Sequence, residues 1–399
     1  MSGENVFLTG GAGSGKSYLV KEFMKHVSAK EMPLLASTGA AAVLIGGRTF
    51  HSFFGLGIME GGPEAVLRRG TADPRLMKRL KQVEGVVIDE ISMIPGQAMA
   101  VAEALARSAR GSSLPWGGLR LLVVGDFTQL PPVTRTRLRD WCFLDPVWEK
   151  TGFQMTSLSL NQRVQDLEYM KLLQNLRFGK LTPSDLDFLE SKVVEYDSPE
   201  EGGTRLFPRR DQTEDFNQKK LQEIPEEEVV FDSIYFGQER AMELLKKSSP
   251  VPEKLTLKKG CKVIFLQNDP QKRWINGTQG FVTDLAADQI KIQKIGGSGK
   301  PLSREVTVEK TSLVYQDADG HVVASVIQFP LNLGYSTTIH KSQGATLEEL
   351  TCDLGALWEP GQAYVALSRL RESGGLRLLR WNPRSVIVDP QVIRFYQNH

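Results

Sequence analysis

Residues 5–17 read "NVFLTGGAGSGKS" and contain the most specific motif of the sequence. An apolar run ends at Gly10, a glycine-rich segment follows, and a helical pattern begins near Lys16. The segment fits G-x-x-x-x-G-K-S, with Gly10, Gly15, Lys16 and Ser17 at the fixed positions. Glycines let backbone N–H groups surround phosphate oxygens, and the N-terminus of the following helix adds its positive end. This order of strand, loop and helix predicts a phosphate-binding loop in a parallel α/β sheet.

The loop supplies most of the predicted contacts to a nucleotide. Lys16 is expected to reach the β- and γ-phosphates of ATP, and Ser17 to hold Mg²⁺. A glycine-rich turn with a surface lysine is the simple alternative, and the flanking strand and helix argue against it. The nucleotide-binding residues predicted here are Gly10, Gly11, Ala12, Gly13, Ser14, Gly15, Lys16, Ser17 and Tyr18.

Outward from the loop, short apolar runs alternate with helical patterns. "PLLAST", "GVVIDE" and "RLLVVGD" read as further strands, which predicts a parallel sheet covered by helices. The pattern returns near the end in "LTCDLG", "GQAYVALSRLR" and "GLRLLRW", so a second α/β unit is expected. Between the two, from about 250 to 328, short strand-like runs are separated by Gly, Asp and Pro turns. That texture predicts a small β-barrel inserted into the second unit.

"GVVIDEIS", residues 85–92, predicts the hydrolytic half of the site. Its strand delivers two adjacent carboxylates at the carboxyl end, where ligands bind in open α/β sheets. Asp89 is expected to organise the metal and Glu90 to polarise the attacking water. Taken alone, the pair reads better as a solvated strand end. Together with the phosphate loop, it predicts nucleotide hydrolysis.

"RLLVVGDFTQLPPV", residues 120–133, ends a further strand with an amide and two prolines. A strand beside the one that carries Asp89 would bring Gln129 within reach of the γ-phosphate. An amide both accepts and donates hydrogen bonds, so it can register whether phosphate is present. Pro131 and Pro132 fix φ and stiffen the path away from the site. We predict a phosphate sensor joined to a rigid lever; a plain proline-rich turn is the alternative.

Composition sets limits on partners and location. The chain is 41% hydrophobic and 24% charged, which is normal for a globular protein, and its net charge is only +2, so a nucleic-acid surface would come from local clustering. Three widely spaced cysteines argue against a disulfide framework or a zinc site and favour a reducing compartment. No apolar run spans a bilayer, so no membrane partner is expected. We expect a cytoplasmic or nucleoid-associated protein from a bacterium or phage, or a nuclear or mitochondrial one from a eukaryote.

Seven segments occur in order along nearly the whole chain: "VFLTGGAGSGKS", "STGAAAVLIGGRTFHSFFGLG", "VVIDEISM", "VVGDFTQLPPV", "LNQR", "STTIHKSQGATLE" and "GQAYVALSR". Together they resemble the motif series of superfamily-one DNA helicases of the PIF-one/RecD-like branch. "ISMIPGQAMAVAEALARSAR" also resembles the stretch that marks the PIF-one family itself.

The resemblance implies two RecA-like P-loop domains, with ATP between them and single-stranded DNA across the top. Residues 1–152 would form the first domain, with a wedge-like insertion near 55–81. Residues 153–250 and 326–399 would form the second, and 251–325 its Src-homology-like β-barrel. Such helicases move 5′→3′ on single strands and separate the duplex ahead of them.

The resemblance also assigns residues of the second domain. Arg163 and Arg369 would reach the γ-phosphate, a role that suits a planar and permanently charged guanidinium. Gln343 and Gly344 would approach the nucleotide across the cleft. For either arginine alone, a surface salt bridge is the common reading. The expected catalytic residues are Lys16, Asp89, Glu90, Gln129, Arg163 and Arg369, with Ser17 and Asp89 for the metal.

The DNA-binding residues follow from the same motifs. Hydroxyls, backbone amides and basic groups would hold phosphates, and an aromatic ring could meet a base. Phenylalanines such as Phe53 are individually more common in a core, and a lone His51 is as often structural. The DNA candidates are Thr38, Gly39, His51, Phe53, Pro131, Thr338, His340 and Lys341.

The expected function is an ATP-dependent DNA helicase that unwinds duplex or G-quadruplex DNA, working as a monomer on single strands and junctions. A RecD-type or conjugative helicase subunit is the enzymatic alternative. A nucleotide-switched DNA-binding module without unwinding is an alternative of another class. In the family a glutamine before the phosphate loop reads adenine; here Gly10 stands near the start of the chain, which leaves base selectivity open.

Overall fold

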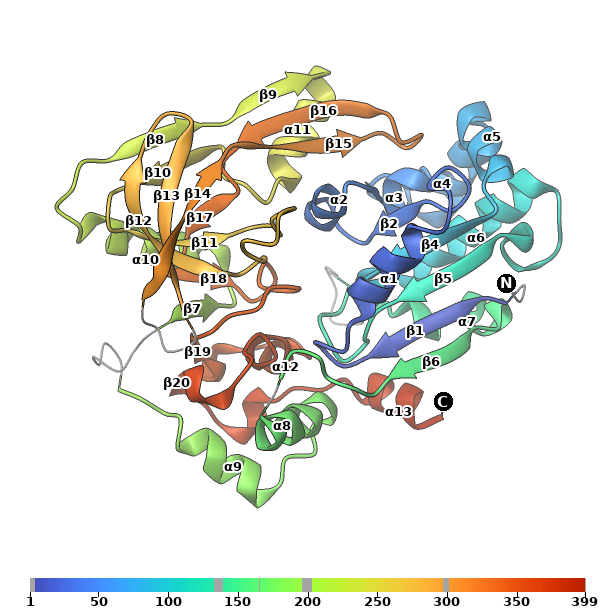
Figure 1. The fold of residues 1–399 in the computed structure, drawn as a ribbon. Helices are drawn as coiled ribbons and strands as arrows, with labels where there is room; N and C mark the ends of the chain where they lie inside the picture. The colour runs from blue at the N-terminus through green and yellow to red at the C-terminus, as the bar shows by residue number, and fades with distance from the viewer. Residues whose placement is uncertain (1–3, 133–138, 165, 196–202, 297–300, 399) are drawn as a thin grey trace.

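The computed structural model describes residues 4–132, 139–164, 166–195, 203–296 and 301–398 (Figure 1). A six-stranded sheet in the order β3-β2-β4-β5-β1-β6 forms the centre of the first unit, and all its strand pairs are parallel. Its strands are β1 (Val6–Gly10), β2 (Leu34–Ala36), β3 (Arg48–Thr49), β4 (Gly85–Asp89), β5 (Arg120–Val124) and β6 (Gln154–Leu158). Its helices are α1 (Lys16–Met24), α2 (Gly39–Ile45), α3 (Phe50–Phe53), α4 (Gly62–Thr71), α5 (Pro74–Gln82), α6 (Gly96–Arg110), α7 (Pro146–Thr151) and α13 (Pro390–Asn398).

The first sheet is covered on both faces, because neighbouring residues of a strand point to opposite sides. Phe7 and Val86 belong to the large hydrophobic cluster shared with α6, whereas Leu8 and Val87 belong to a smaller cluster shared with α1. Near-continuous apolar strands are typical of such doubly covered parallel sheets. The sequence predicted this arrangement from those runs.

A second parallel sheet, in the order β18-β7-β19-β20, forms the centre of the second unit. Its apolar cluster includes Tyr169 and Leu173 of α8 and Val365 of α12. The strands are β7 (Thr204–Phe207), β18 (Ser336–Thr338), β19 (Leu350–Asp353) and β20 (Leu376–Arg380), and the helices are α8 (Leu167–Phe178), α9 (Pro183–Glu190), α10 (Arg210–Gln222) and α12 (Gln362–Leu367).

The insertion, residues 229–333, interrupts the second unit between α10 and β18. It contains a five-stranded antiparallel sheet in the order β14-β13-β12-β11-β17, a three-stranded sheet β15-β16-β9 and a pair β10-β8. The strands are β8 (Val229–Asp232), β9 (Ile234–Gly237), β10 (Lys254–Leu257), β11 (Lys262–Phe265), β12 (Gln279–Leu285), β13 (Gln289–Ile295), β14 (Pro301–Glu309), β15 (Thr311–Gln316), β16 (Val322–Gln328) and β17 (Leu331–Leu333), with helix α11 (Glu239–Ser248).

The prediction of a small barrel over 251–325 is not confirmed. The described strands form three open sheets, and strands outside the predicted range, β8, β9 and β17, take part in them. The five-stranded ladder ends at β14 and β17, because the next hairpin, β15–β16, pairs with β9 in a sheet of its own. The short apolar runs predicted the strands themselves. How the strands associate depends on pairing between strands far apart in the sequence, which the runs do not reveal.

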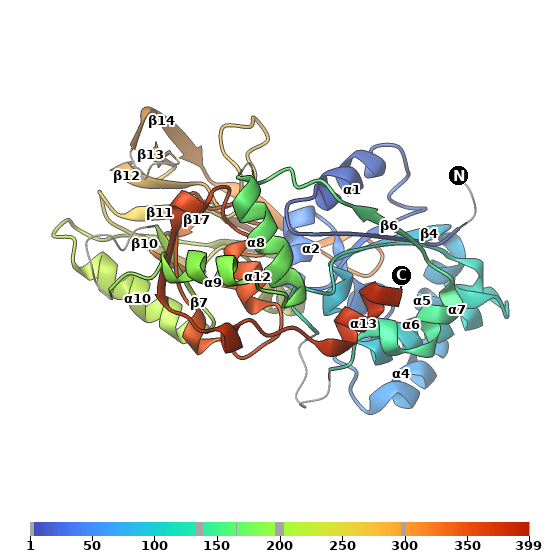
Figure 2. The same cartoon turned by 90° about the horizontal axis from the view of Figure 1, so that it is seen from below.

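The last helix also departs from the predicted division. Residues 326–399 were expected in the second unit, but α13 returns to the first (Figures 1 and 2). Val392 and Phe395 belong to the first unit's cluster, and the Phe395 ring lies 5.3 Å from that of Phe127. The amphipathic pattern of 390–398 predicts burial of one face without saying against which core. Within the described part of the chain, no helix has both the length and the apolarity needed to cross a bilayer.

Candidate functional site

The phosphate loop joins β1 to α1, and glycines permit its shape. Gly13 and Gly15 have φ values of 79° and 90°, a region that L side chains seldom adopt. A Cβ on Gly13 would lie 2.7 Å from the Cβ of Arg163 and 2.8 Å from Oδ1 of Asn161. Glycine at this position therefore lets a segment of the second unit rest directly on the loop.

Three hydrogen bonds hold the loop against the second unit. Asn161 donates through Nδ2 to the carbonyl oxygen of Ala12 at 3.1 Å, and the Gln162 N–H donates to that of Gly13 at 2.8 Å. The Ala12 N–H donates to the hydroxyl of Tyr364 at 2.7 Å. The loop is therefore part of an interface between the two units.

Lys16 lies in the loop among buried charges. Its Nζ donates to the carbonyl oxygens of Gly10 and Gly11 at 2.8 and 3.0 Å. Burial lowers its pKa, while the carboxylates of Asp126 and Glu90 act in the opposite direction. An ammonium held this way beside backbone N–H groups is the electrostatic environment that polyphosphate needs.

Asp89 and Glu90 stand at the carboxyl end of β4, as predicted. The Glu90 N–H donates to Oδ1 of Asp89 at 2.9 Å, and Glu90 has a left-handed backbone, with φ of 55°. Burial, and next the charge of Asp89, raise the pKa of Glu90 to about 7. Among the described residues, Oε2 of Glu90 is buried with no hydrogen-bond partner. A carboxylate with a raised pKa and an unused oxygen can accept a proton from water.

Two arginines approach the same place from the second unit. Arg163 donates through Nη1 to the carbonyl oxygen of Ser368 at 2.7 Å. Arg369 is 1% exposed and donates through Nε to the carbonyl oxygen of Val365 at 2.7 Å and through Nη2 to Oγ of Ser368 at 2.7 Å. Burial lowers the pKa of Arg369 to about 9 and that of Arg163 to about 10, so both stay charged at neutral pH.

Gln129 links the two sides of the site. Its Oε1 accepts from Nε2 of Gln343 at 3.4 Å. The flanking residues belong to different cores: Phe127 packs in the first unit's cluster, and Leu130 in the second unit's cluster. Gly361 of the second unit passes so close that a Cβ there would lie 2.4 Å from the Gln129 carbonyl oxygen.

These residues line one pocket of about 450 Å³ between the units. Of the predicted nucleotide-site residues, Gly10, Gly11 and Gln343 lie next to the lining, and the others are in it. Gln162, Thr346 and Arg371 also line the pocket and were not predicted, although they lie within or beside the quoted motifs. The lining residues are Ala12, Gly13, Ser14, Gly15, Lys16, Ser17, Tyr18, Asp89, Glu90, Gln129, Gln162, Arg163, Gly344, Thr346, Arg369 and Arg371.

The pocket also has a donor set that fits Mg²⁺. Asp89 and Ser17 both line it, and they offer a carboxylate and a hydroxyl oxygen. Mg²⁺ prefers hard oxygen ligands and is usually held by one or two side chains together with phosphate and water. Burial raises the pKa of Asp89, and a bound cation would favour its charged form.

The predicted DNA face of the first unit is partly covered. Thr38 caps α2, with Oγ1 accepting from the Ala41 N–H at 3.2 Å. A Cβ on Gly39 would lie 2.5 Å from that of Ser248, so α11 of the insertion lies against this helix end. His51 is half-buried, and burial lowers its pKa.

Two of the predicted DNA contacts, Phe53 and Pro131, are buried in this structure and stay predictions. Phe53 has 0% exposure, and the guanidinium groups of Arg48 and Arg79 lie 5.3 and 5.6 Å from its ring centre. No face of that ring is open to a base. Pro131 is buried as well, next to Leu130, which belongs to the second unit's cluster.

The DNA candidates of the second unit follow β18. Thr338 is buried, and its hydroxyl accepts from the Lys341 N–H at 3.1 Å. The Lys341 side chain is exposed. His340 is half-buried, with Nε2 at 3.8 Å from Oε2 of Glu359. Of the three, Lys341 is the group best placed to meet a phosphate.

The β15–β16 hairpin of the insertion reaches back to the first unit. Arg79 binds Asp319 through Nη1 at 2.6 Å, Arg48 donates to the carbonyl oxygen of Ala318, and Gln316 donates to that of Gly46 at 2.8 Å. We call these three contacts the hairpin contact.

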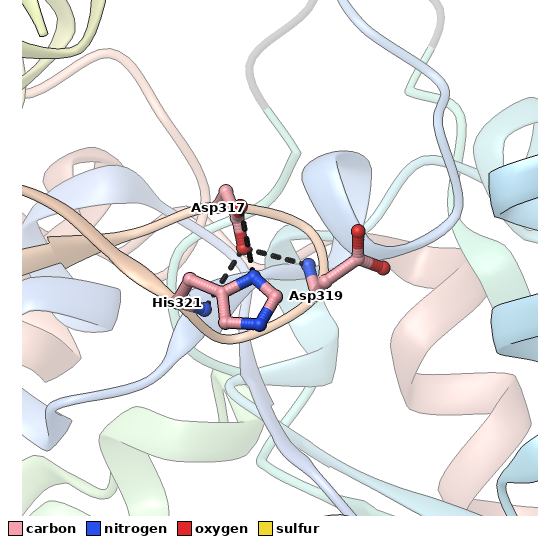
Figure 3. Close-up of side chains that lie close together, drawn as sticks. All are labelled: Asp317, Asp319 and His321. Carbon is pink, nitrogen blue, oxygen red and sulfur yellow. Dashed lines mark hydrogen bonds and ion pairs between the residues drawn. The ribbon is translucent and has the colours of Figure 1, made fainter.

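Figure 3 shows the acidic group at the tip of this hairpin. Asp317, Asp319 and His321 bring one ligand atom each to within 4.8 Å of one another. However, Oδ1 of Asp317 accepts from the backbone N–H groups of Asp319 and His321, both at 2.9 Å, and Asp319 pairs with Arg79. The group is explained by the turn and by the hairpin contact.

Comparison with known proteins agrees with this geometry. A family model of PIF1-like helicases matches residues 1–184. The chain is 62% identical to the ATP-dependent DNA helicase Pif1 of Bdellovibrio bacteriovorus, over 99% of this chain and 89% of that protein. It is 34% identical to PIF1 of Xenopus laevis, of whose length it spans 62%.

Solved structures give the same result. Bacteroides Pif1 in complex with ADP-AlF4 is 28% identical, with a TM-score of 0.87 over 99% of this chain and 93% of that one. Bacteroides Pif1 bound to single-stranded DNA is also 28% identical over the same shares, with a TM-score of 0.64. From the site geometry and these likenesses together, the chain belongs to the Pif1 family of ATP-dependent DNA helicases.

Proposed function

We propose that this protein hydrolyses ATP between its two parallel-sheet units and uses the energy to move along single-stranded DNA and separate duplexes. One observation carries the proposal: Lys16 and Glu90 of the first unit line the same pocket as Arg163 and Arg369 of the second. A terminal phosphoryl group there would contact both units at once. Its loss would change the attraction between them, as a motor requires.

Each residue has a distinct part in the proposed reaction. Lys16 would neutralise the β- and γ-phosphate oxygens, and Arg163 and Arg369 would stabilise the charge that develops as the terminal group leaves. Glu90 would accept the proton of the attacking water. Ser17 and Asp89 would hold Mg²⁺, which shields phosphate charge when bound. We propose that the two units correspond to RecA-like domains.

The DNA track, by which we mean the residues proposed to contact single-stranded DNA, is supported by the likeness to solved complexes. The Bacteroides relative is known in complexes with single-stranded DNA, and one further Pif1 structure concerns DNA unwinding at forked duplex DNA. By that likeness we propose single strands and junctions as ligands here, with Lys341, His340, Thr38 and Gly39 on the track. Polarity from 5′ to 3′, G-quadruplex unwinding, a monomeric working form and location in the cytoplasm or nucleoid stay predictions.

The complete hydrolytic set distinguishes this proposal from a nucleotide-switched binding module. A switch needs to bind ATP but has little use for Glu90, Arg163 and Arg369 together. ATP turnover should therefore rise strongly when single-stranded DNA is added. A binding module would show little change.

The deciding experiment compares partial duplexes with a 5′ tail and with a 3′ tail. We expect ATP-dependent strand separation with the 5′ tail and little with the 3′ tail. Separation of neither, under conditions where single-stranded DNA binds and ATP is hydrolysed, would overturn the helicase proposal. Preference for the 3′ tail would overturn the polarity alone.

A further inference from the structure

Arg177 is a largely buried cation that the proposed chemistry does not use. It is the penultimate residue of α8 in the second unit, and its side chain crosses to the first. Nη2 lies 3.0 Å from Oδ1 of Asp126, and Nε donates to Oγ1 of Thr128 at 3.1 Å. The Arg177 side chain is 13% exposed and that of Asp126 is 0% exposed. A buried charge pair between two units that must move is costly unless its geometry is maintained.

The first unit holds the acidic partner in place through its last helix. The Tyr396 hydroxyl of α13 donates to Oδ1 of Asp126 at 3.3 Å and accepts from the Phe127 N–H at 3.1 Å. The guanidinium of Arg177 lies 5.3 Å from the centre of the Tyr396 ring. Burial by itself raises the pKa of Asp126, but Arg177 and Lys16 outweigh it and keep this carboxyl below its usual pKa. The carboxylate is therefore ionised and fixed.

Asp126 controls the turn that carries Gln129. The Thr128 N–H donates to Oδ1 of Asp126 at 3.1 Å, and the Gln129 N–H donates to its carbonyl oxygen at 3.0 Å. Thr128 thus contacts both members of the ion pair. Any displacement of Arg177 acts directly on Asp126 and Thr128, which lie three residues and one residue before the amide that faces the pocket.

The connection that leads into α8 is bonded to the phosphate loop. Asn161 and Gln162, which bond to that loop, precede α8 by a few residues. The helix is a stiff rod of 12 residues, or about 18 Å at 1.5 Å per residue. The connection before α8 therefore contacts the phosphate loop, and the last turn of α8 contacts the Gln129 turn through Arg177. A change in the pocket that moves α8 reaches Gln129 by a route separate from the γ-phosphate.

We propose that Arg177 is a positioning residue, which through Asp126 keeps the Gln129 turn in register with α8 and so couples ATP hydrolysis to strand separation. This inference rests on the proposed helicase function. The alternative is a purely structural ion pair, which would contribute to folding but not to the yield of unwinding per ATP.

The test measures base pairs unwound per ATP hydrolysed, together with the melting temperature. Removing one charge would leave the other buried and unpaired, so the main variant replaces both, Arg177→Met with Asp126→Asn. We expect this double variant to fold and to hydrolyse ATP. The number of base pairs unwound per ATP should fall by about fivefold or more. Arg380→Gln, which breaks an exposed ion pair with Asp353 in the same unit, is the matched control and should keep the wild-type ratio.

Arg177→Lys keeps the positive charge and is the second test variant, to be used if the double variant does not fold. A lysine has one compact ammonium in place of a planar fork, so it cannot maintain both contacts in the same geometry. We expect a ratio between those of the wild type and the double variant. Wild-type coupling in either folded variant overturns the inference. Wild-type protein that hydrolyses ATP without unwinding would instead overturn the proposed function.

Discussion

Glu90 combines a strained backbone with a buried acid. A non-glycine residue in the left-handed region costs about 1–3 kcal/mol, and such strain is concentrated at functional sites. Here the strain turns the chain at the end of β4 and directs the carboxylate into the pocket. Neither property follows from the letters "DE"; both follow from the strand end and the surroundings it meets.

We expect Glu90→Gln to bind ATP and DNA but to lose turnover. An amide cannot accept the proton of the attacking water, so DNA-stimulated hydrolysis should fall by about 10²-fold or more. Single-turnover hydrolysis beside nucleotide-binding titrations would measure this. Glu149→Gln, an exposed residue of α7, is the control. Unimpaired turnover would remove Glu90 from the mechanism.

Gln129→Ala should uncouple ATP hydrolysis from strand separation. The amide accepts from Gln343 and lines the pocket, whereas its neighbours are anchored in two different cores. Truncation leaves those anchors intact, so we expect DNA and ATP binding close to normal and fewer base pairs unwound per ATP. Gln154→Ala, at the exposed start of β6, is the control. A normal yield per ATP would contradict the sensor interpretation of residues 126–132.

Individual elements were predictable where local pattern decides them. β1, β4 and β5 followed from apolar runs, and the loop before α1 from its glycines. The Arg177–Asp126–Tyr396 group was not predicted, because its contacts join residues 51 and 270 positions apart. The pairing of β9 with β16 in the insertion likewise joins strands far apart in the sequence and was not predicted. Phe53 was offered as a DNA contact, yet the neighbouring arginines that cover its ring come together only in the fold.

β11 carries a buried lysine that gives a test of electrostatics. Lys262 is 8% exposed, and its Nζ donates to the carbonyl oxygen of Gly203 at 2.8 Å. Burial lowers its pKa from 10.5 to about 8. At 1.36 kcal/mol per pKa unit, keeping it charged costs the fold roughly 3 kcal/mol. Below pH 8, Lys262 is protonated in both the folded and the unfolded chain, so the full free-energy cost of burying its charge reduces the stability of the fold.

Lys262→Met should therefore stabilise the protein in a pH-dependent manner. Between about pH 8 and 10.5 the unfolded chain binds more protons at this site, so wild-type stability rises with pH and the advantage of the variant shrinks. We expect a gain of about 2 kcal/mol near pH 7, after allowing for the lost hydrogen bond, and less near pH 10. Urea unfolding at both pH values measures it, with the exposed Lys259→Met as control. The same gain at both values would contradict the assignment.

The whole molecule is arranged around contacts between units. The hairpin contact and the packing of Ser248 over Gly39 place the insertion against the predicted DNA face of the first unit. The likeness to the Bacteroides ADP-AlF4 complex, TM-score 0.87, exceeds that to its single-stranded DNA complex, 0.64, at equal identity. On the proposed DNA track, a strand that reached Thr38 would have to displace the insertion.

Asp319→Asn should make that displacement easier. It removes the charge that pairs with Arg79 while keeping the size of the side chain. We expect faster association with single-stranded DNA by about two- to fivefold, since a partly exposed pair contributes up to about 1 kcal/mol. Stopped-flow binding measures the rate, with Asp288→Asn, an almost fully exposed residue of the insertion, as control. An unchanged association rate would show that the hairpin contact does not limit access.

The return of α13 has a mechanical meaning. The described chain passes between the two parallel-sheet units once between β6 and α8 and again between β20 and α13. Two units joined by one covalent connection can rotate about it in many directions. Two connections restrict the relative motion mainly to opening and closing about the line that joins them. Cleaving the chain near residue 385 should remove this restriction while α13 stays packed on the first unit. The step length along DNA should then vary more from one ATP hydrolysed to the next.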